Sequence, residues 1–303
     1  MQRRRLEYRY FTYIFFQSQI KFHSEYQLDY FFPVTYTQIG IKAENKGVCM
    51  FSLGIDSGST MTKGVLFDGN DVVGCHMLPT SMRPGEIVRD IYDRLYTEDT
   101  GFVVSTGYGR ELLKEADAKI TEITCHGAGA SYLAPGCDTV IDIGGQDCKV
   151  ITLDSHGQVN DFLMNDKCAA GTGRFFESMA NAFEMSLEEF SKLSLTAENV
   201  IPITAQCTVF AESEVITLVG EGKPQNEIAA GIQQAVAKRC FVMAKKAGAK
   251  DAITLTGGCA KNQGLKAAIE KVLRMKVIEL KIDPQLMGAL GAAEYARQKG
   301  LDL

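Results

Sequence analysis

Two segments of this chain repeat one another in register, and this repeat constrains the fold more than any other feature. Each begins with an aspartate, Asp56 or Asp142, that is followed by Gly two residues later, Lys seven later and Asp twelve later. An apolar stretch precedes and follows each segment, as in a β-hairpin with a glycine-rich turn. A single such turn is common, whereas two in register predict two related lobes that offer their hairpins to a shared cleft.

The residues of the two predicted turns are suited to holding an anion. Glycines let backbone N–H groups approach a phosphate, and successive N–H groups form a concave anion site. An aspartate at a strand end cannot bind phosphate directly, but Asp56 and Asp142 can hold Mg²⁺ through water. The candidate turn residues are Gly58, Ser59, Thr60, Met61, Thr62 and Lys63 in the first copy, and Gly144, Gly145 and Gln146 in the second.

From residue 50 onward, stretches with strand character alternate with helical stretches, which predicts an α/β fold. A third glycine turn, Thr256-Gly257-Gly258, has the strand–Gly-Gly–helix form that lets a ligand lie close to the backbone. An ordinary strand–helix turn has the same appearance. Residues 283–293 predict a helix with a small-residue face, and close packing against another element is the favoured interpretation. The glycine turn at 106–110 is best read as a chain reversal, with partner contact as the alternative.

Motifs of other nucleotide-binding and hydrolytic classes are absent from the sequence. There is no Gly-x-x-x-x-Gly-Lys-Ser/Thr, which argues against a P-loop protein. No Gly-x-Gly-x-x-Gly follows the first predicted strand, so a dinucleotide-binding fold is disfavoured. Neither His-Glu-x-x-His nor Gly-x-Ser-x-Gly occurs.

Composition excludes several classes of protein and predicts the cellular compartment. A net charge of −5 argues against nucleic acid as the main partner, and no apolar run is long enough to predict a membrane span. The nine cysteines are scattered without any Cys-x-x-Cys, so a zinc ribbon or thioredoxin-type site is not supported. Free thiols spread in this way predict a reducing, cytoplasmic environment.

The first 49 residues differ in composition from the rest. They are basic and hold 12 of the 27 aromatic residues, yet their longest apolar run, near 11–16, is too short for a signal peptide. Met50 stands directly before the first predicted strand. We interpret 1–49 as an N-terminal extension outside the functional fold, with Met50 as the working start. A partner-binding or membrane-surface arm is the alternative.

Two cysteines, Cys125 and Cys168, are predicted to lie where a strand or loop passes into a helix. The helix dipole and free N–H groups at such a position favour the thiolate. Thiolates in glycine-rich surroundings suit an iron–sulfur cluster, but a four-iron cluster takes four cysteines, so a two-fold dimer would have to supply the other pair. The alternative is two buried core cysteines, and spacing alone favours it.

The two hairpins and the Thr256 turn resemble the phosphate-1, phosphate-2 and adenosine motifs of the actin/Hsp70/sugar-kinase superfamily. Three longer motifs, at 142–149, 162–174 and 207–214, closely resemble the BadF/BadG/BcrA/BcrD ATPase family of 2-hydroxyacyl-CoA dehydratase activators and benzoyl-CoA reductase subunits. The resemblance extends from about residue 51 to about residue 297. It implies an α/β, two-lobed actin/Hsp70-like ATPase with duplicated ribonuclease-H-like domains and an ATP cleft between them. The implied lobes are 50–135 plus 284–303, and 136–283.

The resemblance also implies cofactors, partners and residue roles. A homodimer would hold one [4Fe-4S] cluster through Cys125 and Cys168 of each chain, and ATP or ADP would bind with Mg²⁺. Electrons would come from ferredoxin or flavodoxin and pass to an iron–sulfur dehydratase or reductase. Asp56, Asp142 and Gln146 would be catalytic, Gly257, Gly258 and Gln285 would lie along adenosine, and Glu214 or Glu212 would orient water or ribose. An ordinary solvated helix face is the alternative for the two glutamates. Cys207 matches no expected ligand position and is interpreted as a core or incidental residue.

Two other functions fit part of this pattern. A small-molecule kinase of the same superfamily would explain the hairpins and the adenosine turn, but not two cysteines at helix starts. Such a kinase also needs a carboxylate base aimed at a substrate hydroxyl, and none stands out. A non-catalytic, ATP-gated scaffold like actin is the third candidate, and it needs filament surfaces that a sequence does not reveal.

Overall fold

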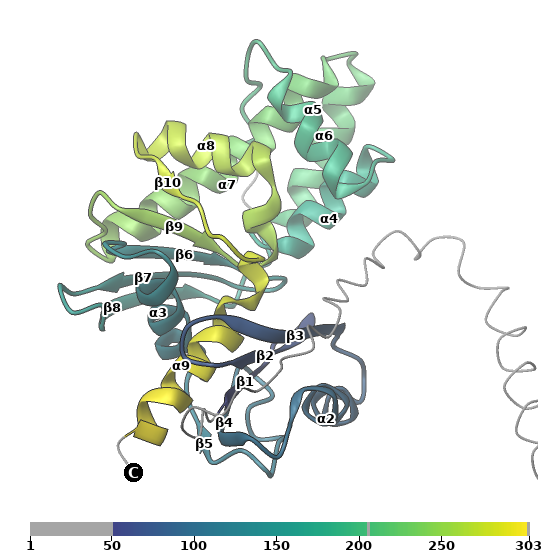
Figure 1. Cartoon of the computed structure of the whole chain (residues 1–303). Coiled ribbons are helices and arrows are strands. Elements are labelled where there is room, and N and C mark those ends of the chain that lie inside the picture. The colour runs from purple at the N-terminus through teal and green to yellow at the C-terminus, as the bar shows by residue number, and fades with distance from the viewer. Residues whose placement is uncertain (1–50, 205–206, 302–303) are drawn as a thin grey trace, which may run out of the picture. The chain divides into compact units, whose positions relative to one another are not determined.

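The computed structural model of the chain describes residues 51–204 and 207–301 (Figure 1). Both interpretations of the N-terminal extension therefore concern residues outside the described part. Among the described helices, none combines the length and the apolar character that a membrane crossing requires.

The first of two five-stranded sheets in the described residues carries the first copy of the repeat. Its strand order is β3-β2-β1-β4-β5, with β1 antiparallel to β2 and parallel to β4. Its strands are β1 (Phe51–Ser57), β2 (Met61–Phe67), β3 (Val72–Pro79), β4 (Thr100–Thr106) and β5 (Ala118–Lys119). Helix α2 (Pro84–Leu95) packs on β1, β2 and β3, while α9 (Met287–Leu301) packs on β1, β2 and β4.

The second sheet repeats this arrangement with the second copy. Its order is β10-β9-β6-β7-β8, with β6 antiparallel to β7 and parallel to β9. Its strands are β6 (Thr139–Ile143), β7 (Cys148–Leu153), β8 (Val159–Asn165), β9 (Ile253–Thr256) and β10 (Val277–Ile278). Each Asp-x-Gly segment thus lies at the first turn of a three-strand meander, and the first strand of each meander pairs with a parallel fourth strand.

Helices cover the second sheet and extend beyond it (Figure 1). They are α4 (Gly173–Ala182), α5 (Leu187–Leu195), α6 (Thr208–Gly220), α7 (Gln225–Lys246) and α8 (Gln263–Leu273). One apolar cluster joins them to the strands and includes Ile141 and Val150 from the sheet and Phe176, Phe190 and Ile232 from the helices. This lobe therefore has its own core, separate from the cluster around Leu53 and Ile55 in the first sheet.

Helix α3 (Glu122–Leu133) connects the two halves, because it packs against α9 as well as against β6, β7 and β8. The contact with α9 depends on missing side chains: a Cβ at Gly291 would lie 1.7 Å from the Cys125 carbonyl oxygen. The predicted close packing of the small-residue helix is therefore confirmed. The lobe limits 50–135 plus 284–303 and 136–283 stay a prediction, and the two sheets fall within them.

The packing of α3 on α9 predicts that one added methyl group at Gly291 lowers the stability of the fold. Replacing Gly291→Ala forces the two helices apart, and overpacking of this kind destabilises by about 1–3 kcal/mol. Urea unfolding followed by circular dichroism measures the change. A matched control is Gly85→Ala in α2, where a Cβ meets nothing within 4 Å and the substitution should be neutral or slightly stabilising. Equal midpoints for the two variants would contradict the packing argument.

Candidate functional site

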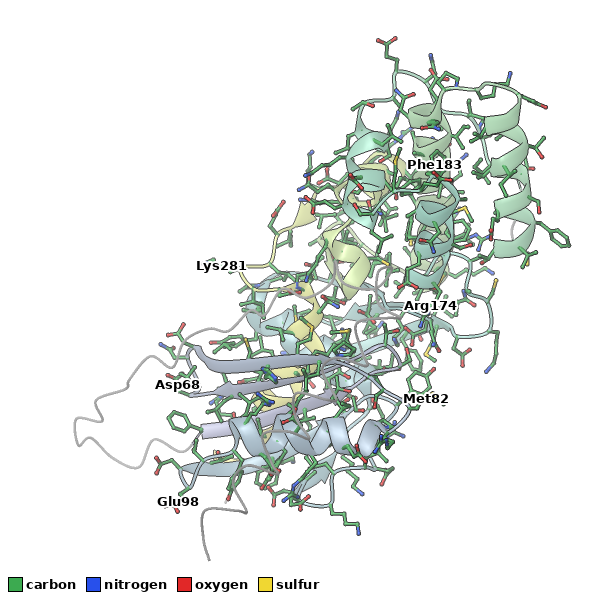
Figure 2. All side chains as sticks on the ribbon, turned by 90° about the vertical axis from the view of Figure 1, so that its right-hand side faces the viewer. Asp68, Met82, Glu98, Arg174, Phe183 and Lys281 are labelled. Carbon is green, nitrogen blue, oxygen red and sulfur yellow. The ribbon has the colours of Figure 1, made fainter. Side chains whose placement is uncertain are left out.

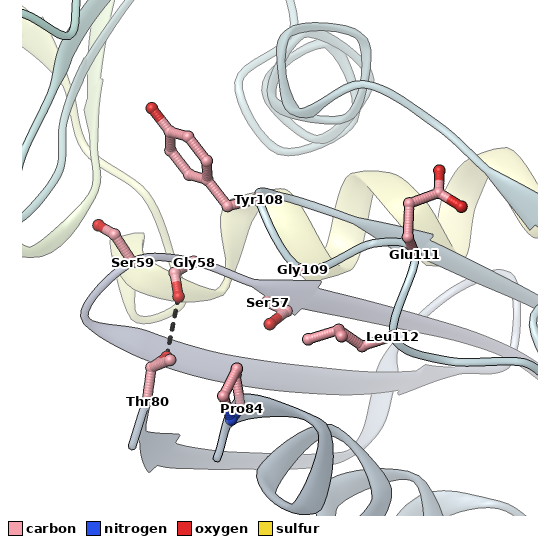
Figure 3. Close-up of a pocket in the computed structure, with 9 residues that line it drawn as sticks. All are labelled: Ser57, Gly58, Ser59, Thr80, Pro84, Tyr108, Gly109, Glu111 and Leu112. Atoms are coloured by element: carbon pink, nitrogen blue, oxygen red, sulfur yellow. Dashed lines mark hydrogen bonds between the residues drawn. The ribbon is translucent and has the colours of Figure 1, made fainter. Parts of the chain in front are cut away.

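The first hairpin joins β1 to β2 through a tight turn at residues 58–60, called here the first turn. Asp56 faces Lys63 across the ladder, and Lys63 Nζ donates to Asp56 Oδ2 at 2.8 Å. The backbone N–H of Gly58 donates to the Met61 carbonyl at 3.1 Å, while Thr80 Oγ1 donates to the Gly58 carbonyl at 2.9 Å (Figure 3). The predicted hairpin is confirmed, and the lysine seven residues on neutralises the aspartate.

The second hairpin reproduces this pairing in a more buried setting. Asp142 faces Lys149 in the β6–β7 ladder, and the second turn comprises residues 144–147. Lys149 Nζ lies 2.8 Å from Asp147, 3.2 Å from Asp142 and 3.6 Å from Glu122. Burial alone would lower the pKa of Lys149, but these three carboxylates outweigh it and raise that pKa. The lysine therefore stays charged and holds three acidic groups together.

Asp142 stays ionised in spite of its burial. Burial alone would raise its pKa, but His126, Lys149 and a hydrogen bond from Thr256 together hold the pKa well below its usual range. The Thr256 hydroxyl donates to Asp142 Oδ1 at 2.8 Å. A buried carboxylate that keeps its charge is suited to orienting Mg²⁺ or its bound water, which is the role expected of this residue.

The first and second turns meet directly. A Cβ at Gly145 would lie 2.0 Å from Thr60 Oγ1, so only glycine fits opposite this hydroxyl. Thr60 Oγ1 is itself buried and makes no hydrogen bond within the described residues. A buried hydroxyl without a hydrogen-bond partner is unusual, and its place where two anion-type turns meet makes Thr60 a candidate phosphate donor.

The third glycine turn lies beside the second hairpin. Gly257 has a φ of 80°, and a Cβ there would lie 2.4 Å from the Ile143 carbonyl oxygen. The adjacent Gly258 would place a Cβ 3.4 Å from Gln285 Nε2, and Gln285 Oε1 accepts from Lys261 Nζ at 2.8 Å. The structure thus brings together Gly257, Gly258 and Gln285, which the sequence predicted along one edge of a nucleotide.

A cavity of about 320 Å³ opens beside the first turn (Figure 3). Ser57, Gly58 and Ser59 line one side, and Tyr108, Gly109 and Glu111 line the other. The Gly109 N–H donates to the Ser57 carbonyl at 3.0 Å. The turn that was read as a chain reversal therefore forms a wall next to the predicted phosphate site.

The structure places one of the two predicted cluster cysteines at the surface and buries the other. Cys125 is 0% exposed under α9, and burial raises the pKa of its thiol to about 12. A cluster shared between two subunits cannot reach a thiol enclosed within one chain. Cys168 is exposed, and so is Cys207, the N-cap residue of α6, which the sequence interpretation had set aside as core or incidental. Among the described cysteines, Cys168 and Cys207 are the two that are exposed, whereas Cys125 is enclosed within the chain.

The surroundings of Cys207 are unusually apolar for a surface. Val209 and Phe210, in the first turn of α6, are 67% and 70% exposed. Among the described residues, no group of three or more His, Cys, Asp or Glu side chains is placed to hold a metal ion. Exposed apolar residues beside exposed thiols are typical of a surface that is covered in an assembly.

The glutamates of α6 lie in positions that the sequence did not predict. Glu214 accepts from the Thr204 N–H and hydroxyl at 3.0 and 2.9 Å, and Thr204 lies just before Cys207 in the chain. Glu212 accepts from Ser178 Oγ of α4 at 2.7 Å. Both contacts brace the Cys207 region, so orienting water or ribose stays a prediction for these residues.

Sequence reasoning missed the residues that connect the hairpins through space. The sequence assigns no role to His126, and it indicates Thr256 only as part of a glycine turn. Lys149 was recognised as a repeat position, but its partners Glu122 and Asp147 were not. No local spacing could have found these partners, because His126 and Thr256 are 130 residues apart.

Two matching hairpins with opposed glycine turns, one from each of two βα lobes, define a two-lobed ATPase of the actin, Hsp70 and sugar-kinase type. The model of the BadF/BadG/BcrA/BcrD ATPase family matches residues 53–296. The chain belongs to this family.

Named relatives agree with this assignment. The chain is 42% identical over 253 residues to the 2-hydroxyisocaproyl-CoA dehydratase activator of Clostridioides difficile, covering 82% of this chain and 95% of that protein. It is 44% identical over 253 residues to the activator of lactoyl-CoA dehydratase of Anaerotignum propionicum, covering 82% and 97%. The structure of the Clostridium difficile activator with bound ADPNP superposes with a TM-score of 0.77 at 41% identity, covering 84% of this chain and 96% of that one.

Thiol accessibility provides a direct check of the cysteine assignment. In the reduced, metal-free protein, maleimide should modify Cys168 and Cys207 within minutes, because both are exposed. Cys125 should react only after unfolding, since it is buried and its thiol resists ionisation. Peptide mass spectrometry at timed intervals identifies the modified residues. Rapid modification of Cys125 in the folded protein would contradict the assignment.

The carboxylates around Lys149 predict that the stability of the fold depends strongly on the charge of this lysine. Lys149→Met leaves three neighbouring carboxylates without their cation, and breaking a buried pair from one side destabilises by about 3–5 kcal/mol. The matched control is Lys192→Met, whose exposed i,i+4 pair with Glu188 should contribute little to stability. Chemical denaturation measures both. A loss for Lys149→Met as small as that of the control would show that the cluster does not stabilise the fold.

Proposed function

We propose that this protein is an ATP-dependent activator that delivers a low-potential electron to a 2-hydroxyacyl-CoA dehydratase or a benzoyl-CoA-reductase-like partner. The observation that carries the proposal is the combination, in one chain, of two opposed phosphate-type turns with two exposed cysteines. The names of the relatives point to dehydratase activation, and the neighbour with bound ADPNP points to a nucleotide at this fold.

ATP binding is assigned to the two turns and the third glycine turn. Thr60 of the first turn meets Gly145 of the second, and the N–H groups and hydroxyls of the two turns suit phosphates. Asp56 and Asp142 are assigned to Mg²⁺ and water, with Lys63 and Lys149 fixing their carboxylates. Gln146 is exposed in the second turn and is assigned to the water that attacks the terminal phosphate. Gly257, Gly258 and Gln285 are assigned to adenosine.

The cluster assignment differs from that made on the sequence. Cys168 and Cys207 of each chain of a homodimer are proposed to hold one [4Fe-4S] cluster, and ferredoxin or flavodoxin is the proposed donor. Exposed thiols at the start of α6 and shortly before α4, beside exposed apolar residues, support this choice. Such a cluster supplies a one-electron redox site. The proposed compartment is the cytoplasm.

Two backbone hydrogen bonds join the second turn to the start of α4, close to Cys168 in the chain. The N–H of Gly173 donates to the Gly144 carbonyl at 2.8 Å, and that of Arg174 donates to the Gly145 carbonyl at 2.9 Å. These residues begin α4, and Figure 2 labels Arg174 at the end of the helical group nearest the strands. Because residues 168–172 run directly into α4, a displacement of the second turn by nucleotide moves the segment that carries Cys168.

Metal analysis of the full chain tests the proposal. Protein purified without oxygen should be brown, with about four irons per two chains. Cys168→Ser and Cys207→Ser should each lose the iron, because each removes half of the ligands in a dimer. Cys125→Ala is the matched control and should keep it, since this thiol is buried.

The outcomes separate the candidates. A colourless protein that stays colourless after anaerobic reconstitution, yet hydrolyses ATP, would overturn the electron-transfer role and favour the small-molecule kinase. Loss of iron in Cys125→Ala but not in Cys207→Ser would restore the ligand pair predicted from the sequence.

A further inference from the structure

His126 occupies an unusual place between the two hairpins. It is a buried residue of α3. Nδ1 lies 3.2 Å from Thr256 Oγ1 and 3.6 Å from Asp142 Oδ1. A Cβ at Gly288 would lie 3.0 Å from His126 Nε2 and 2.7 Å from Asp56 Oδ2. One imidazole thus has the second-lobe aspartate on one side and the first-lobe aspartate on the other.

The hydrogen bonds determine which nitrogen of the His126 ring carries the proton. The Thr256 hydroxyl has one hydrogen, and it donates that hydrogen to Asp142 Oδ1 at 2.8 Å. Thr256 Oγ1 can therefore only accept from His126, so Nδ1 carries the proton and donates. The chain of bonds runs from His126 to Thr256 and then to Asp142. Nε2 is turned toward Gly288 and the Asp56 carboxylate.

The backbone around His126 is closely packed on both sides. Gly127 lies so close to β8 that a Cβ there would be 2.7 Å from Val159, and Gly291 of α9 touches the carbonyl of Cys125. Helix α3 is thus clamped on both sides of residue 126. A side chain projecting from such a helix has a fixed origin, which is what a positioning residue needs.

We propose that His126 is a positioning residue for ATP hydrolysis, which orients Asp142 through Thr256 and sets its place relative to Asp56. This inference rests on ATP hydrolysis by the two hairpins and is independent of the cluster. An outer partner of this kind does not contact nucleotide, so its removal misplaces the carboxylate without removing a nucleotide contact. Losses of about 10- to 100-fold in activity are typical for partners that orient metal-associated carboxylates.

The proposal predicts a specific pattern of steady-state ATPase constants. His126→Ala should lower kcat by about 10- to 100-fold while KM for ATP stays within about threefold. His126→Asn, whose amide can donate from nearly the position of Nδ1, should recover most of kcat, whereas His126→Gln, which places its amide near Nε2, should not. His156→Asn, in an exposed loop, is the matched control and should behave like the unmodified protein.

Thr256 supplies a second, independent test. Thr256→Val removes the hydroxyl at nearly constant shape and should match the loss in His126→Ala, while Thr256→Ser should retain activity. If His126 acts through Thr256, the double variant loses no more than the worse single variant. The inference would be overturned if the kcat losses of the two single variants multiplied in the double variant. It would also be overturned if His126→Ala kept a normal kcat. If His126→Ala does not fold, two comparisons of kcat decide: His126→Asn against His126→Gln, and Thr256→Val against Thr256→Ser.

The failure of the inference can be distinguished from failure of the proposed function. An unmodified protein that hydrolyses no ATP would overturn both. Normal hydrolysis that is insensitive to His126 and Thr256 would overturn the inference alone. Iron content plays no part in these readouts.

Discussion

The rest of the structure depends on the pairing of an aspartate at the end of one strand with a lysine at the start of the next. In each lobe this pair crosses the hairpin ladder, and in the second lobe the lysine gathers two further carboxylates. Buried charges are tolerated only when they are paired, so each lysine makes it possible for acidic groups to stand at the edge of a core. The turns between the paired residues are then free to consist of glycines and hydroxyls.

The pairing also explains why so much of the fold could be predicted from the sequence. A repeated Asp–Gly–Lys–Asp spacing determines register, turn position and strand direction together, and these are local properties. The two hairpins, the third glycine turn and the close packing of α9 all follow from neighbours in the chain or from residue size. The family assignment rests on the same segments, which is why it agrees with the matched range of residues 53–296.

The cysteines show where local reasoning fails. Cys125 does lie near a helix start, as predicted, but the helix-start argument takes no account of what another part of the chain places above it. Helix α9, more than 160 residues later, encloses this thiol because Gly129 and Gly291 let the helices approach. Cys207 was set aside by motif position, yet its exposure at the start of α6 is a property of tertiary structure. Burial is decided by partners distant in sequence, and so is the placement of His126 between two aspartates.

The return of α9 to the first sheet has a consequence for how the chain folds as it is made. Ala289, Leu290 and Ala293 complete the core around Val65 and Phe67, yet they are synthesised after every strand of both sheets. The second lobe, whose strands and covering helices all precede α9, can close its core while the first sheet still has one face bare. The lobe that is begun first is thus completed last. During that interval the apolar face that α9 later covers stays exposed to solvent.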